Sequence, residues 1–325
     1  MTHGSADKTA RAAMRPGSGK ANASSALCVN ALSVDLEDYF HAEALAPVAP
    51  RESWDRLAPR CARATDELLA MFAQAGARAT FFVLGWVARR DPALVRRIAA
   101  AGHEVASHGM EHVRVDRQDA ERFRADVASS RALLEDISGT RVAGYRAPCF
   151  SIGRGEFWAY PILAEEGYAY SSSVYPVRHD AYGLPGAPRG PFRPREASGL
   201  VEFTLPTLGF AGHDLPAGGG GFFRLLPYAA SRWAIERVNR VEGRASIFYV
   251  HPWELDPGQP RFAGLPARSR LRHYLNLGRT APRLRRLLRD FRWDRIAAVH
   301  AAEIAAPGAL PAWSPADPAT RRPGR

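Results

Sequence analysis

Short apolar runs alternate with segments of helical periodicity along most of the chain. Apolar runs bounded by glycine, proline or acidic residues predict buried strands, and apolar residues three or four positions apart predict amphipathic helices. The alternation predicts an α/β fold, with a parallel sheet or barrel inside a layer of helices. The predicted strands are 27–36, 79–85, 103–108, 142–148, 168–174, 246–251 and 295–299. The predicted helices are 64–75, 92–101, 117–136, 155–166, 226–242 and 281–291.

The stretch 175–223 interrupts this alternation. It is rich in proline and glycine and contains four consecutive glycines at 218–221. In parallel α/β folds the chemistry lies at the C-terminal ends of the strands. We therefore predict a loop-rich insertion over the mouth of the barrel.

The apolar pattern extends over 27–300 without a linker-like gap, which predicts one domain there. Residues 1–26 are small and polar, and 301–325 are rich in proline, alanine and arginine, so we expect a disordered arm and a disordered tail. No apolar run approaches the ~20 residues that span a bilayer, and no stretch resembles a secretion signal. These features predict a cytoplasmic protein.

The formal net charge of +11 is unevenly spread along the sequence. From Arg261 to Arg295 there are eleven arginines and only two acidic residues. Such a segment could attract nucleic acid, anionic lipid or an anionic glycan, or it could form an ordinary solvated helix face. No nucleic-acid-binding motif accompanies it, so we favour the solvated face and predict no nucleic-acid partner.

Carboxylates and histidines gather at the ends of two predicted strands. Asp35, Glu37 and Asp38 end the first strand, and crowded carboxylates repel each other unless a cation or proton compensates. His108 and His112 end the third, and their spacing places both imidazoles on one face if the segment turns helically. Either motif alone fits a solvated turn. Together, two histidines and a carboxylate favour a metal site with open positions.

Two further polar residues end later strands. Arg146, in YRAP, could hold a carboxylate in a fixed orientation, or it could form an ordinary structural salt bridge. His251, in YVHPWE, could be a general acid near neutral pH, or a buried histidine with satisfied hydrogen bonds.

The chain resembles the polysaccharide deacetylase family, carbohydrate esterase family four, in five segments taken in order. These are NALSVDLEDYFHAEAL, TFFVLGWVA, GHEVASHGMEH, GYRAPCFSI and IFYVHPWE. A subgroup found beside exosortase and exopolysaccharide loci is the most similar. Three segments of this chain resemble the C-terminal extension of that subgroup, which corresponds to about 224–300 here. They are LPAGGGGFFRLLPY, HPWELDPGQPR and RHYLNLGRTAPRLRRLL.

The resemblance implies a distorted (β/α) barrel that binds a divalent metal, usually zinc. It makes Asp35 the general base and Arg146 the arginine that orients this base. His108 and His112 match the two metal histidines of the family. His251 matches the general acid that protonates the leaving amine.

Two departures from the family pattern matter. The first motif reads D-L-E-D instead of two adjacent aspartates, so the third metal ligand is either Glu37 or Asp38. Members of the subgroup commonly have an acidic residue at the position of Ser171, where it helps to tune the acid histidine. Its absence affects the pKa expected for His251. A backbone N–H near Tyr39 is expected to help stabilise the oxyanion.

Residues and resemblance together predict a metal-dependent hydrolase that removes N-acetyl groups from a polysaccharide or lipid-linked glycan. The resemblance implies a role in exopolysaccharide biosynthesis, in the cytoplasm or at the inner membrane face, beside polysaccharide-synthesis machinery. The alternatives are an amidohydrolase acting on a non-sugar amide and a catalytically inactive glycan-binding protein. The glycine-rich insertion and several aromatic residues favour a sugar chain. The aromatic residues are Trp158, Tyr160, Phe222 and Phe223.

Overall fold

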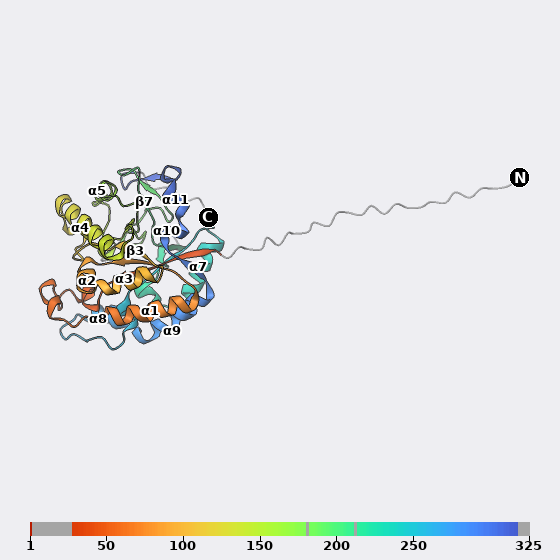
Figure 1. The fold of residues 1–325 in the computed structure, drawn as a ribbon. Coiled ribbons are helices and arrows are strands. Elements are labelled where there is room, and N and C mark those ends of the chain that lie inside the picture. The colour runs from red at the N-terminus through yellow and green to blue at the C-terminus, as the bar shows by residue number, and fades with distance from the viewer. Residues whose placement is uncertain (2–27, 180–181, 211–212, 318–325) are drawn as a thin grey trace.

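The computed structural model describes Met1 and residues 28–179, 182–210 and 213–317, so the expected arm at 1–26 lies outside it apart from Met1. In the described residues eight strands form one parallel sheet, in the order β10-β1-β2-β3-β4-β5-β7, with β11 also paired to β1. The sheet curls inside a layer of helices, which confirms the distorted barrel (Figure 1). The sheet strands are β1 (Val29–Leu36), β2 (Thr80–Val83), β3 (Glu104–Ser107), β4 (Gly144–Tyr145), β5 (Tyr170–Ser171), β7 (Val201–Glu202), β10 (Ile247–Val250) and β11 (Arg292–Asp294). Two small sheets pair β6 (Arg193–Pro194) with β12 (Ala312–Trp313), and β8 (Thr207–Phe210) with β9 (His213–Pro216).

The strand registers align the chemically interesting residues along one edge of the sheet. β1 is buried along nearly its whole length, as expected for a parallel strand covered on both faces. In β1, Asp35 pairs with Phe82 of β2, and Val34 pairs with Val250 of β10. The C-terminal ends of β1, β2, β3, β4 and β10 therefore open onto the same edge.

The helices follow the predicted periodicity, and local capping sets several of their ends. Asp119 accepts a hydrogen bond of 2.9 Å from the Arg122 N–H at the start of α4, and Gly139, with φ 64°, ends that helix in the left-handed region. No helix among the described residues is long and apolar enough to cross a membrane. The helices are α1 (Cys61–Ala75), α2 (Gly85–Arg90), α3 (Pro92–Ala100), α4 (Ala120–Ser138), α5 (Ala159–Glu165), α6 (Gly220–Leu225), α7 (Tyr228–Arg240), α8 (Ala267–Tyr274), α9 (Leu277–Asp290), α10 (Ile296–Val299) and α11 (Ala301–Ala305).

The last strand predicted from the sequence is wrong. The strand β11 ends at Asp294, and the segment predicted as a strand at 295–299 is largely the helix α10. The Ile296 N–H donates to Thr80 Oγ1 at 2.8 Å. Because this N–H is already used, Ile296 cannot continue the backbone ladder of β11.

The insertion at 175–223 contains more regular structure than predicted, because β7 extends the sheet and β8 and β9 form a hairpin. Its glycine run packs tightly against β10. Gly219 has φ 115°, and a Cβ atom there would lie 2.2 Å from the Tyr249 carbonyl oxygen. The glycines therefore let the insertion approach the strand that precedes His251.

The expectation of a disordered tail over 301–325 is wrong for residues 301–317. This segment forms α11 and then β12, which pairs with β6 of the insertion. Trp313 is buried, with ring centroids 5.6 Å from Phe157 and 5.3 Å from Phe192. The burial of the Trp313 ring thus stabilises the ordered structure of a segment whose composition otherwise indicates disorder.

Candidate active site

The ends of four strands bring the predicted site residues together. Asp35 lies in β1, His108 directly follows β3, Arg146 directly follows β4, and His251 directly follows β10. All four side chains are mostly buried. Because the strands are parallel neighbours in a curled sheet, residues more than 200 positions apart in sequence meet at one site.

Glu37, His108 and His112 form a group that could hold a metal ion. The Nε2 atoms of His108 and His112 each lie 3.5 Å from a different Glu37 carboxylate oxygen. Both Nε2 atoms are buried, and neither has a hydrogen-bond partner among the described residues. His108 donates from Nδ1 to the Arg146 carbonyl oxygen at 2.8 Å, which leaves Nε2 as the lone-pair nitrogen. This donor set fits a divalent cation.

The two histidines meet through a loop and not through the helical turn assumed from their spacing. Residues 108–113 belong to no helix, and His112 has φ 55°, a left-handed value that is uncommon for residues other than glycine. Gly109, with φ 76°, directs the chain into this loop. Strained backbone of this kind is common at functional sites.

The structure does not bring Asp38 to the histidines. One Asp38 carboxylate oxygen accepts from the Tyr39 N–H at 2.9 Å. The other accepts from the N–H groups of Arg60 and Cys61, at 2.6 and 3.0 Å. Asp38 therefore ties the end of β1 to the start of α1. The oxyanion donor was expected near Tyr39, and the N–H of Tyr39 itself is engaged by Asp38.

Asp35 is held by a buried arginine, as its strand-end position suggested. Arg146 donates from Nη1 to Asp35 Oδ1 at 2.6 Å and to Ser33 Oγ at 2.9 Å. Its Nε donates to the Ser172 carbonyl oxygen at 3.0 Å, and its guanidinium lies 4.0 Å from the centroid of the Phe82 ring. These contacts fix the Asp35 carboxylate and leave Oδ2 facing His251, 3.9 Å from its Nε2.

His251 has an acidic partner that the sequence reasoning missed. Glu254, in the 3-10 helix that follows β10, lies 2.7 Å from His251 Nδ1. Arg224 of α6 donates to the other Glu254 oxygen at 2.6 Å. Ser171, where an acidic residue was expected, instead hydrogen-bonds Ser173 at 2.8 Å. The three-residue spacing in HPWE was the available signal.

This partner decides the protonation of the histidine. Burial alone would lower the pKa of His251, but the Glu254 hydrogen bond and the charges on Glu37, Glu254 and Asp35 outweigh it and raise this pKa to about 9. Burial alone would raise the pKa of Glu254, but Arg224 and His251 lower it to about 2. The imidazole is therefore mostly protonated at neutral pH.

One cavity of about 550 Å³, here called the site pocket, is lined by the candidate site residues Asp35, Glu37, His108, His112 and His251. Its walls include Gly221 of the insertion and Leu271 of the C-terminal extension, so both segments contribute. Phe222 lines it as well, whereas the three other aromatic residues expected to favour a sugar pack elsewhere. Those three are Trp158, which packs on Phe123, Tyr160, which hydrogen-bonds Glu202, and Phe223, which packs on Phe248.

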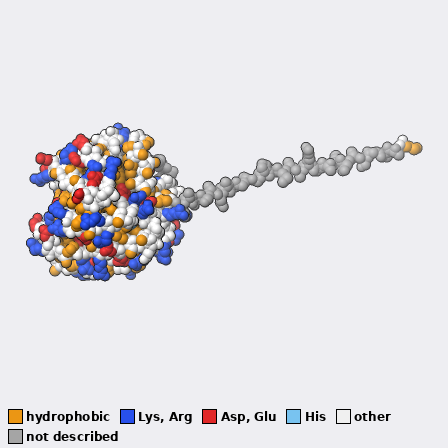
Figure 2. Space-filling model, in the orientation of Figure 1, with side chains coloured by type: hydrophobic (Ala, Val, Ile, Leu, Met, Phe, Trp, Pro, Cys, Tyr) orange, Lys and Arg blue, Asp and Glu red, His pale blue; other side chains and the backbone are white. Residues whose placement is uncertain are grey.

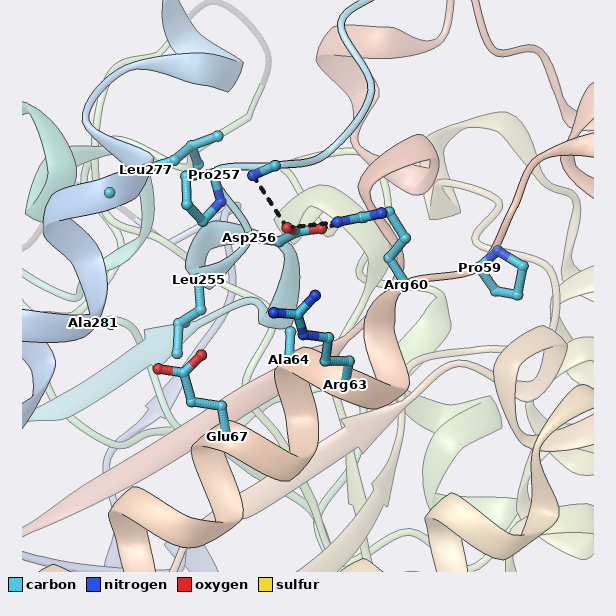
Figure 3. Close-up of a pocket in the computed structure, with 12 residues that line it drawn as sticks. Pro59, Arg60, Arg63, Ala64, Glu67, Leu255, Asp256, Pro257, Leu277 and Ala281 are labelled. Carbon is cyan, nitrogen blue, oxygen red and sulfur yellow. Dashed lines mark hydrogen bonds and ion pairs between the residues drawn. The ribbon is translucent and has the colours of Figure 1, made fainter.

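A second cavity, of about 510 Å³, lies between α1 and the start of α9. Arg60 and Asp256 point toward each other across it and form an ion pair (Figure 3). Glu67, which also lines it, is paired with Arg285 at 3.1 Å. The lining residues include no histidine, so this cavity lacks the acid–base groups of the site pocket.

Several arginines of the basic segment 261–295 have structural partners. Arg283 donates to backbone carbonyl groups at the C-terminal end of α6, and Arg295 is paired with Asp294 at 3.5 Å. On the face drawn in Figure 2, basic side chains are interspersed with acidic and apolar ones.

Two family models match the chain. The polysaccharide deacetylase model matches residues 53–155, and a domain of unknown function (DUF3473) matches residues 172–301. The first range holds the two candidate metal histidines, and the second holds His251, Glu254 and Arg224. The fold and the first match support the polysaccharide deacetylase family for this chain.

The sequence also matches two curated deacetylases over part of their length. A chitooligosaccharide deacetylase from a Bradyrhizobium strain is 33% identical over 112 residues, 34% of this chain and 48% of the relative. A peptidoglycan-N-acetylglucosamine deacetylase from Bacillus cereus is 31% identical over 71 residues, 22% of this chain and 33% of the relative. The chain thus spans less than half of each of these curated relatives.

One solved structure shares the fold over nearly the whole chain. It is a candidate polysaccharide deacetylase from Mycobacterium smegmatis, with a TM-score of 0.55 and 19% sequence identity. The similarity covers 92% of this chain and 96% of that chain. At this identity the match establishes the shared fold.

Proposed function

We propose that this chain is a metal-dependent deacetylase that removes N-acetyl groups from a polysaccharide or lipid-linked glycan. The observation that carries the proposal is the convergence of Glu37, His108 and His112. The Nε2 atoms of the two histidines lack hydrogen-bond partners among the described residues. Asp35 and His251 line the same pocket. The match to the deacetylase family model and the two relatives named for acetylated sugars support an acetyl amide as the substrate.

Glu37, His108 and His112 would hold the cation, which we propose to be zinc. Two imidazoles and one carboxylate with open positions are a common catalytic zinc site. Burial alone would raise the pKa of Glu37, but the nearby histidines lower it well below its usual value, so the carboxylate stays ionised. A bound divalent ion supplies Lewis acidity that activates water and polarises the acetyl oxygen.

Asp35 and His251 would carry the two proton transfers. Asp35 takes the proton of the attacking water on Oδ2, because Arg146 occupies Oδ1. His251 Nε2 then gives its proton to the amine nitrogen as the C–N bond breaks, releasing acetate. Glu254 on Nδ1 keeps the ring oriented and charged for that step.

The resemblance of the C-terminal extension supports a proposal for the biological setting. We propose a role in exopolysaccharide biosynthesis, on an intermediate at the cytoplasmic membrane face. The two alternatives make different predictions for a glycan substrate. A non-sugar amidohydrolase would release no acetate from it, and an inactive glycan-binding protein would bind it without turnover.

The test combines metal analysis of the purified protein with acetate release from chitooligosaccharides, peptidoglycan fragments and N-acetylated exopolysaccharide. We expect one divalent ion per chain and acetate release that Asp35→Asn abolishes. Hydrolysis of a purine-ring amide without acetate release from any glycan would support the amidohydrolase. Tight glycan binding without acetate release by the metal-loaded protein would support the binding protein.

A further inference from the structure

A second group of three side chains in the site pocket has the spacing of a cation site. Asp35, Glu37 and His251 each offer one ligand atom, and these atoms lie within 4.8 Å of one another. His251 Nε2 lies 3.5 Å from Glu37 Oε1 and 3.9 Å from Asp35 Oδ2. Oxygen and nitrogen ligands at about 2.0–2.2 Å from a tetrahedral cation are roughly 3.3–3.6 Å apart. The three side chains therefore need little movement to enclose an ion.

The histidine of this group is oriented as metal-binding histidines are. A ligating imidazole usually donates its other ring N–H to a carboxylate or a carbonyl oxygen, which directs the lone pair of the free nitrogen at the ion. Glu254 occupies His251 Nδ1 at 2.7 Å, and Arg224 holds Glu254 in place at 2.6 Å. His251 Nε2 therefore faces the two carboxylates. A proton and a cation compete for this nitrogen, because a metal ligand must be deprotonated.

Glu37 lies between this group and the first candidate metal group. Its Oε1 atom is 3.5 Å from the Nε2 atoms of both His108 and His251, and its Oε2 atom is 3.5 Å from His112 Nε2. One carboxylate can therefore serve two ions. Paired metal ions in enzymes lie about 3.5–4 Å apart. Two cations at that distance repel each other, so the second ion binds more weakly than the first.

We propose that Asp35, Glu37 and His251 form a second, weaker site for a divalent cation, and that filling it inhibits the enzyme when metal is in excess. The inhibition rests on the proposed function. The second ion would occupy Asp35 Oδ2 and His251 Nε2, the atoms assigned to the two proton transfers. The binding of the ion does not depend on the reaction, because it needs only the three ligand atoms and their spacing.

Equilibrium dialysis of the purified full-length chain against Zn²⁺ tests the second site. We expect one ion that stays bound in metal-free buffer and a second that binds only when zinc is in excess. Asp35→Asn and His251→Ala should each weaken the second ion at least about tenfold, because even the loss of a group behind a ligand typically costs 10–100-fold in metal affinity. Both variants should keep the first ion, which shows that the pocket remains folded.

The control is Glu303→Gln, which removes a carboxylate 3.2 Å from His300 Nδ1, outside the site pocket. This variant should bind both ions like the wild type. A single ion at every zinc concentration would overturn the proposal. A second ion that Asp35→Asn and His251→Ala bind as tightly as the wild type, or that Glu303→Gln loses, would also overturn it, by placing that ion elsewhere on the protein.

The second site and the proposed function fail separately. Acetate release should fall over the zinc concentrations that fill the second site, and it should recover after dialysis back to one ion. Full turnover with both ions bound would overturn the inhibition. A chain that binds two ions as expected but releases no acetate from any glycan would overturn the proposed function and support the cation site. A chain that releases acetate with one ion and never binds a second would overturn the second site alone.

Discussion

Glu37 and Asp38 are adjacent acids with different environments, and their side-chain directions explain why. Asp35 and Glu37 are two positions apart, so both point toward the same side of the strand end. Asp38 points away and accepts three backbone N–H groups, two of them from Arg60 and Cys61. The sequence could not choose between the two acids, because two of the three partners of Asp38 lie more than 20 positions away.

Replacement of each acid should therefore have a different effect. Glu37→Ala should lower the metal content of the purified protein while leaving the thermal unfolding of the metal-free protein nearly unchanged. Asp38→Ala should keep the metal but lose stability, by about 1–3 kcal/mol for each buried N–H group left without a partner. Metal analysis and chemical denaturation of both variants provide the test. Metal loss in Asp38→Ala with metal retained in Glu37→Ala would reverse the assignment.

The proton-transfer residues should be separable from the metal-binding ones. Asp35→Asn keeps the shape of the side chain but cannot accept a proton, and His251→Ala removes the acid. Each should lower kcat by ~10²–10⁴-fold, the usual contribution of general acid–base catalysis, with metal content unchanged. Glu52→Gln, at an exposed site outside the pocket, serves as the control. If His251→Ala turns over near the wild-type rate, the acid lies elsewhere.

The Glu254 carboxylate should set the alkaline limit of activity. Turnover needs protonated His251, so activity falls as the pH rises through the pKa of this histidine, which Glu254 helps to raise to about 9. Glu254→Gln keeps the shape but removes a negative charge, so it should move the alkaline limb to lower pH, by on the order of one unit. The pH–rate profiles of the two proteins measure this shift. An unmoved alkaline limb would show that another group sets it.

At the scale of single elements, helix α9 shows why a basic segment need not be a binding surface. Arg283 Nη1 donates to the carbonyl oxygens of Phe223, Arg224 and Leu226, at 2.7, 3.0 and 3.0 Å. These groups end α6, the helix that carries the Arg224 side chain to Glu254. Arg283 therefore stabilises the element that positions the partner of His251.

Arg283→Gln should destabilise the protein by about 1–3 kcal/mol, because it removes charge-assisted bonds to several carbonyl groups. Arg289→Gln, an exposed position on the same helix, should change the free energy of unfolding by less than about 0.5 kcal/mol. Both variants lose one positive charge, so their free energies of unfolding, measured by urea denaturation, separate the effect of the lost hydrogen bonds from the effect of the lost charge. Equal stabilities of the two variants would show that the hydrogen bonds of Arg283 do not matter. If the wild type bound DNA at physiological salt and both variants lost this binding equally, the segment would act through its charge alone.

The elements that sequence reasoning predicted well are those with a strong pattern of their own. The strand β1 and the helices α1 and α4 were recognisable from their continuous or periodic apolar residues. The predicted strand ends placed Asp35, His108 and His251 at the edge of the sheet where they meet. Features set by distant contacts were missed or misplaced. The role of Glu254 depends on Arg224, and the end of β11 depends on a hydrogen bond from Ile296 to a threonine of β2.

At the scale of the whole molecule, the C-terminal segment fastens the insertion to the rest of the fold. Residues 312–317 contact the insertion at several points beyond the pairing of β12 with β6. Ser314 Oγ donates to Glu196 at 2.7 Å, and Arg195 pairs with Asp317 at 2.9 Å. The insertion in turn supplies Phe222 to the site pocket, so the end of the chain supports the pocket indirectly.

This arrangement predicts a large effect from one residue near the C-terminus. Trp313→Ala removes a buried ring that packs between Phe157 and Phe192, and such a truncation typically costs about 3–5 kcal/mol. Ala305→Ser, an exposed change in the neighbouring helix α11, should leave stability within about 0.5 kcal/mol. Chemical denaturation measures both variants. Because the ring anchors β12 against the insertion, limited proteolysis of Trp313→Ala should also cut first within 193–317 and not in β1 or α1. Wild-type stability and an unchanged cleavage pattern in Trp313→Ala would show that the insertion is held by its own contacts with the sheet.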